Sequence, residues 1–321
     1  MVTVKFSDRD EHSSEFIEAL KQGDKKKIKE IPKSDLHNHS PLGVRFRDFN
    51  ERHEGEVPPP PDYMNGLEAL ADYLDRIVGF MNTREEIEFL LKKCLETACK
   101  DGVQVLEASI DATFLQFYDR HQEFFAFIRE LQEKFSPEME FRPELGVARI
   151  LPQESWETYV PPCLESGVFH SIDLYDQESV NNLDLYSKYY RKAHEKDLKI
   201  KVHVGEFCEP QQIKETIEVL DPEVIQHGIT AIKSDEVMQM IKDRNIILNM
   251  APTSNVKLGA VEKLSDHPLP EFYDRDIPVT INTDDLMIFD SSVSEEFLKV
   301  FKAGLLSAEE LDHIRRIGLY S

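Results

Sequence analysis

The segment Lys199-Ile-Lys-Val-His-Val-Gly-Glu-Phe207 is a short apolar run that ends in a histidine, with a glutamate three residues later. Alternate side chains of a β-strand point to opposite faces, so His203 can reach a pocket at the end of a strand over 199–204. The turn at Gly205 then brings Glu206 over the same pocket. A lone strand-end histidine is more often structural, so its meaning depends on what lies at the ends of the other strands.

Seven further short apolar runs in the sequence predict β-strands. They lie at residues 34–37, 103–109, 142–148, 169–174, 224–226, 246–250 and 278–282. Amphipathic, helix-like stretches separate most of them, among them 84–100, 119–134, 184–196, 211–220 and 235–243. Eight strand–helix alternations predict an α/β fold, a (β/α)8 TIM-type barrel, whose usual size is ~250 residues plus insertions.

Two additions to the minimal barrel are expected within a single domain spanning 1–321. Residues 1–30 are polar with a helical pattern, which predicts peripheral N-terminal helices. Residues 41–81 form an insertion after the first strand, with four consecutive prolines at 58–61 and an amphipathic stretch at 67–80. A long loop with its own helix at the top of a barrel suits a lid or a pocket wall, although a surface insertion without function is the alternative.

Composition narrows the range of partners and compartments. The chain has 61 acidic and 38 basic residues, a net charge of −23, which disfavours nucleic acid as a partner. No run approaches the ~18 apolar residues of a membrane helix, and the first ten residues are too charged for a secretory signal. The four cysteines contain no C-x-x-C pair. We therefore expect a cytoplasmic protein with no membrane partner; the sequence leaves its oligomeric state open.

Candidate metal ligands recur at the predicted carboxyl ends of the strands, where barrel enzymes carry their chemistry. His37 and His39 stand two residues apart on the first strand, so both face one side. His203 ends the fifth strand, His227 the sixth, and Asp284 follows the eighth. Histidine nitrogens with one carboxylate and an open position suit a single catalytic Zn²⁺ per chain. His227 is either a ligand or a residue that orients the water on the metal.

These strand-end residues belong to a set of short motifs with a familiar order. The set comprises Asp35-Leu-His-Asn-His39, His203-Val-Gly-Glu206, Gln226-His-Gly228, Ala251-Pro-Thr-Ser-Asn255, His267-Pro268 and Thr283-Asp-Asp285. Together they resemble the adenosine deaminase branch of the amidohydrolase superfamily, from Pro32 to about Phe289. Each motif is short, but the combination is specific.

The resemblance implies a role for each matching residue. His37, His39, His203 and Asp284 would bind zinc, and Glu206, His227 and Asp284 would form the catalytic set. Glu206 would protonate the purine ring nitrogen beside the attacked carbon, and His227 would hold and polarise a zinc-bound hydroxide. Asp285 would accept a hydrogen bond from the substrate. The expected reaction converts an adenine-type ring of a purine nucleoside or base to the 6-oxo product and ammonia.

Two departures from the family pattern concern the substrate. Where the family has a carboxylate and a glycine that bind the ribose, this chain reads Ser40-Pro-Leu-Gly43. Where the family has a glycine after the fourth strand, this chain has Tyr175-Asp176, which we expect to contact the substrate. Arg45 and Arg47 could meet an anionic substituent, but surface salt bridges are their commoner role.

Two other functions remain open at this level. The chain could be a metallohydrolase of the same superfamily that cleaves a non-purine substrate, since metal, hydroxide and an acid serve many hydrolyses. It could also be a catalytically silent relative that binds a nucleoside. The intact ligand set argues against the silent relative, and the sequence does not rank the candidate aminopurines.

Overall fold

A computed structural model describes residues 10–321 and contains one eight-stranded parallel sheet, with the strands in sequential order around a nearly closed barrel. The strands are β1 (Lys33–His39), β2 (Val103–Asp111), β3 (Glu140–Ala148), β4 (Ser171–Tyr175), β5 (Lys199–Val204), β6 (Val224–His227), β7 (Ile247–Met250) and β8 (Val279–Ile281). All eight predicted strands are confirmed, with limits that differ by at most two residues.

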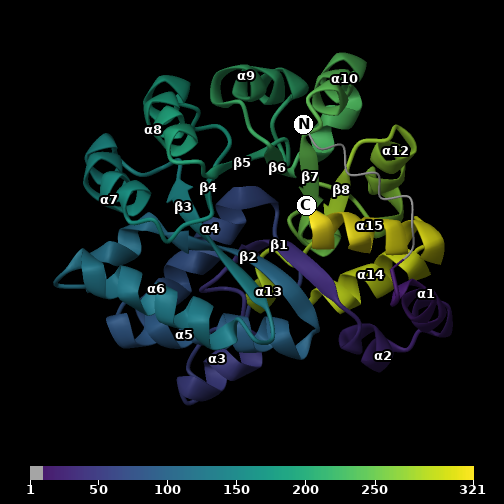
Figure 1. The fold of residues 1–321 in the computed structure, drawn as a ribbon, viewed down its shortest axis with the longest axis horizontal. Coiled ribbons are helices and arrows are strands. Elements are labelled where there is room, and N and C mark those ends of the chain that lie inside the picture. The colour runs from purple at the N-terminus through teal and green to yellow at the C-terminus, as the bar shows by residue number, and fades with distance from the viewer. Residues whose placement is uncertain (1–9) are drawn as a thin grey trace.

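Helices form an outer ring around the strands, as Figure 1 shows. They are α1 (Ser13–Gln22), α2 (Lys25–Glu30), α3 (Phe46–Arg52), α4 (Gly66–Ile77), α5 (Arg84–Lys100), α6 (His121–Phe135), α7 (Gln153–Glu165), α8 (Leu183–Glu195), α9 (Pro210–Leu220), α10 (Asp235–Asp243), α11 (Pro252–Lys257), α12 (Leu269–Asp274), α13 (Leu286–Phe289), α14 (Val293–Lys302) and α15 (Ala308–Tyr320). Short 3-10 turns are η1 (Val78–Phe80), η2 (Ala112–Phe117), η3 (Ile229–Lys233) and η4 (Leu264–Asp266). The sequence did not predict α7, because Pro161 and Pro162 interrupt its pattern.

The two additions to the barrel occupy different places. The helices α1 and α2 pack against α14 and α15, so the beginning and the end of the described chain lie together (Figure 1). Residues 1–9 of the predicted N-terminal segment lie outside the described part. The helix α4 of the 41–81 insertion contributes Leu67, Leu70 and Leu74 to the wall of the cavity at the carboxyl ends of the strands, described below. Between residues 10 and 321, no helix has the length and apolar character needed to cross a membrane.

The interior of the barrel holds a buried cation, Lys201 of β5. Its Nζ lies 2.9 Å from Oε2 of Glu107, also bonds Glu144, and donates to the carbonyl oxygen of Leu36 at 2.8 Å. Burial opposes the charge of Lys201, but the two glutamates outweigh it and raise the pKa of its ammonium. Lys201 of β5 therefore ties its own strand to β1, β2 and β3, and fixes the backbone of β1 one residue before His37.

The seam between β1 and β8 is closed largely by side chains. The Leu36 N–H donates to Oδ1 of Asn282 at 2.8 Å, and the Thr283 N–H donates to Oδ1 of Asp35 at 3.1 Å. One backbone bond, from Asp284 N to His37 O at 2.9 Å, completes the contact. These bonds hold His37 and Asp284 side by side although 247 positions separate them in the sequence.

Candidate active site

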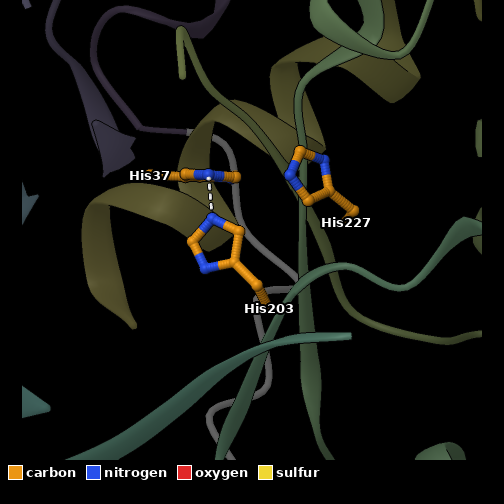
Figure 2. A group of neighbouring side chains, drawn as sticks. All are labelled: His37, His203 and His227. Atoms are coloured by element: carbon orange, nitrogen blue, oxygen red, sulfur yellow. Dashed lines mark hydrogen bonds between the residues drawn. The ribbon is translucent and has the colours of Figure 1, made fainter. Parts of the chain in front are cut away.

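The predicted metal ligands converge at the carboxyl ends of the strands. The Nε2 atoms of His37 and His203 lie 3.0 Å apart, and Figure 2 shows these two nitrogens directed at each other, with His227 beside them. Oδ1 of Asp284 lies 3.6 Å from Nε2 of His37 and 3.5 Å from Nε2 of His39. All four ligands that the resemblance implied are therefore neighbours.

The donor set fits a small divalent cation. Ligands about 2.0–2.2 Å from one zinc ion stand roughly 3–3.6 Å apart, which matches these separations. Two overlapping groups, His37 with His203 and His227, and His37 with His39 and Asp284, each bring their ligand atoms within 4.8 Å of one another. Burial and the neighbouring histidines lower the pKa of both His37 and His203 well below the ordinary value, so both are neutral imidazoles with a free lone pair.

Contacts behind the ligands orient their rings. Nδ1 of His203 lies 2.8 Å from Oδ2 of Asp173, which turns Nε2 toward the centre of the site. Nδ1 of His37 lies 3.5 Å from the carbonyl oxygen of Asn249. Such contacts fix the tautomer of a metal-binding histidine and raise its basicity. Asp173 was not predicted from the sequence, although a charged residue inside the apolar run of β4 was a usable signal.

Glu206 enters the same pocket from the turn after β5. Its Oε1 lies 3.7 Å from Nδ1 of His227 and accepts a hydrogen bond from Nδ2 of Asn255 at 2.7 Å. Burial, followed by the charges of Asp284 and Glu178, raises the pKa of Glu206 well above its ordinary value. A raised pKa favours the protonated form of the carboxyl group, which is the form able to donate a proton.

A second carboxylate, Glu178, holds the backbone of that turn. Its Oε1 accepts from the N–H of Glu206 at 3.0 Å, and its Oε2 accepts from the N–H groups of Phe207 and Cys208 at 2.7 and 2.8 Å. Three amide donors on one buried carboxylate set the position from which Glu206 projects. Glu178 lies in a polar loop after β4, where nothing in the sequence distinguished it.

Tyr175 and Asp176, which were expected to contact the substrate, both line the cavity. The Tyr175 hydroxyl bonds Asp111, and the ring lies in T-shaped contact with His39 at 5.2 Å between centroids. Gly146 makes room for it, because a Cβ there would stand 2.2 Å from Oγ of Ser109 and 3.0 Å from Cε1 of Tyr175. Asp176 has a left-handed backbone, with φ of 82°, a conformation that glycine adopts more readily than other residues.

The cavity measures about 330 Å³ and combines an apolar wall with an acidic lining. The acidic residues that line it are Asp75, Asp111, Asp176, Glu178, Glu206, Asp284 and Asp285. Oδ1 of Asp285 and Oγ of Ser109 are buried and have no hydrogen-bond partner within residues 10–321, so both are available to a ligand.

No lysine or arginine belongs to this cavity lining. Arg45 pairs with Asp290 and Glu295, at 2.6 Å each, and Arg47 lies 3.4 Å from Asp48. Both arginines line a separate hollow beside the proline run. These contacts support the salt-bridge interpretation of the two arginines.

Comparison with known proteins places the chain among deaminases. The sequence model of the adenosine deaminase family matches residues 61–321. A putative adenosine/adenine deaminase of Treponema pallidum is 29% identical over 278 residues, which cover 86% of this chain and 93% of that protein.

Three solved structures share the fold. The adenine deaminase from Arthrobacter aurescens superposes with a TM-score of 0.78 at 24% identity, over 90% of this chain and 92% of that one. A zinc-bound amidohydrolase from Burkholderia ambifaria gives 0.76 at 18% identity, over 91% and 85%. Arabidopsis ADAL complexed with GMP gives 0.75 at 22% identity, over 90% and 91%.

Proposed function

Because the chain belongs to the adenosine deaminase family, we propose that it uses zinc to deaminate an adenine-type ring, replacing the exocyclic amine with oxygen and releasing ammonia. The observation that carries the proposal is the convergence of His37, His39, His203 and Asp284 on one point, with Glu206 in the same cavity. The zinc-bound amidohydrolase of the same fold supports the choice of metal. Bound zinc would lower the pKa of a water toward 7 and so supply a nucleophile at neutral pH.

The chain's own residues divide the remaining work. Glu206, protonated in its buried site, would give its proton to the ring nitrogen beside the attacked carbon, so that no ring anion forms. His227 would orient the attacking water, and Asp284 would accept a hydrogen bond from that water in addition to holding the metal. Asp285, with one oxygen lacking a partner, would accept a hydrogen bond from the substrate.

We further propose that the substrate carries no phosphate. The cavity lining has seven acidic residues and no lysine or arginine, so a phosphate group would find no ammonium or guanidinium partner among these side chains and would lie near carboxylates. One pair of like unit charges about 8 Å apart, at an effective dielectric constant of ~20, costs about 2 kcal/mol, and a phosphate carries up to two charges. A purine base or nucleoside is therefore the expected substrate, in contrast to the nucleotide bound by the ADAL neighbour.

The test is ammonia release from zinc-loaded protein with adenine, adenosine, deoxyadenosine and adenosine monophosphate. We expect kcat/KM for the monophosphate to be at least ~100-fold below that for the best uncharged substrate. Glu206→Gln should retain zinc and lose more than nine-tenths of turnover. Equal rates with the monophosphate would refute the substrate proposal.

The same experiment distinguishes the two other functions from deamination. A hydrolase of non-purine substrates would leave every purine unchanged while retaining zinc. A silent binding relative would bind adenosine without releasing ammonia, and added zinc would restore nothing.

A further inference from the structure

We propose that His267 and Asn255 form a positioning relay that sets the tautomer of His227 and the oxygen on which Glu206 carries its proton. The inference rests on the proposed function. It gives a role to two motifs, 251–255 and 267–268, that take no part in the reaction scheme above. All four side chains are buried.

The relay starts from the backbone N–H of Leu269, a group that can only donate a hydrogen bond. It donates to Nδ1 of His267 at 3.1 Å, so that nitrogen is an acceptor. Burial lowers the pKa of His267 to about 3, so its ring is neutral and its single hydrogen lies on Nε2. His267 therefore presents a donor to Asn255.

The donor on His267 fixes the orientation of the Asn255 amide. Nε2 of His267 lies 3.2 Å from Oδ1 of Asn255, which must accept. The two hydrogens on Nδ2 then point the other way, toward Oε1 of Glu206 at 2.7 Å and Nδ1 of His227 at 3.1 Å. Asn255 supplies one hydrogen to each.

These hydrogen bonds determine which atoms of His227 and Glu206 carry a hydrogen. Because Nδ1 of His227 accepts, the ring hydrogen lies on Nε2, 3.9 Å from Oδ2 of Asp284 on the metal side. A protonated Nε2 cannot ligate a metal, so His227 is a donor toward the attacking water. Because Oε1 of Glu206 accepts from Asn255, the acid proton lies on Oε2.

The tautomers are read directly by long-range ¹H–¹⁵N correlation on zinc-loaded protein with ¹⁵N-labelled histidine, using His227→Gln and His267→Gln to assign the rings. We expect Nε2–H at both His227 and His267. An Nδ1–H signal at His227, or metal ligation through its Nε2, overturns the proposal. This measurement needs no substrate, so it stands even if the proposed deamination fails.

Asn255→Asp tests the relay by function, because an aspartate accepts on both oxygens. We expect His227 to change to the Nδ1–H tautomer and kcat to fall at least ~100-fold, with KM within about threefold. His267→Phe frees the amide and should cost about 10-fold in kcat, with both tautomers present. The control Asn245→Asp adds the same charge at an exposed site and should change neither reading. An Asn255→Asp protein with unchanged tautomer, or with kcat within threefold of wild type, overturns the relay.

Discussion

Replacing Lys201 with methionine should destabilise the barrel strongly, because it leaves Glu107 and Glu144 buried without their cation. Breaking a buried ion pair by removing one partner costs about 3–5 kcal/mol. An unfolding entropy of about 2.1 cal/mol/K per residue, applied to a chain of 321 residues, converts this into a fall in Tm of about 4–8 °C. Thermal unfolding followed by circular dichroism, on metal-free protein at pH 7, measures it.

Two companion variants decide whether the cause is the unpaired charge. Lys199→Met removes the neighbouring lysine of the same strand, which lies 3.5 Å from Oε1 of Glu107 and is partly exposed, so its Tm should fall by less than 2 °C. Adding Glu107→Gln and Glu144→Gln to Lys201→Met should restore at least half of the lost stability. A Tm for Lys201→Met within 2 °C of wild type, or a triple variant no more stable than the single one, would refute the reasoning.

Three further outcomes follow from the site. His267 has a folded-state pKa of about 3, below its unfolded value of 6.5, so its contribution to stability is present above pH 6.5 and is lost as the pH falls toward 3. Between pH 7 and pH 5, the free energy of unfolding measured by urea titration should therefore fall by about 2 kcal/mol less in His267→Phe than in the wild type. Glu178→Ala should release the amides of Glu206, Phe207 and Cys208, seen as at least ~10-fold faster hydrogen exchange there, whereas an unchanged rate would show that other contacts hold the turn. Chelation of the metal should lower Tm by several degrees and readdition of Zn²⁺ should restore it, while Mg²⁺, which prefers an all-oxygen octahedral site, should not.

The barrel was predictable because its strands are buried on both faces. Such strands appear in the sequence as short apolar runs, and amphipathic helices separate them with a different period. Some limits shifted where polar residues continue a strand, as at His39 and Asp111, and others where the strand begins or ends inside the apolar run, as in β4, β7 and β8. Helix α7 was missed because Pro161 and Pro162 lie within it, and the sequence does not show that the surrounding packing sustains that helix.

The convergence of the proposed metal ligands was predictable because each stands at or just after a strand end, and the strand ends of a barrel meet at one face. The residues that orient them were not. Asp173, Glu178 and Asn255 act through contacts that depend on the closed barrel, and Glu178 reaches the turn after β5 from the loop after β4. Such contacts are not visible in the sequence, although Asp173 stands out there as a charged residue inside an apolar run.

The side-chain seam between β1 and β8 has a consequence for the order of assembly. His37 and Asp284 come from the first and last strands, so a metal held by both is a crosslink that closes a loop of nearly the whole chain. During synthesis, His37 and His39 are made early, but the carboxylate that completes their site arrives only with the residues after β8. High-affinity uptake of the proposed metal would thus be a late event, possible only once all eight strands are in place.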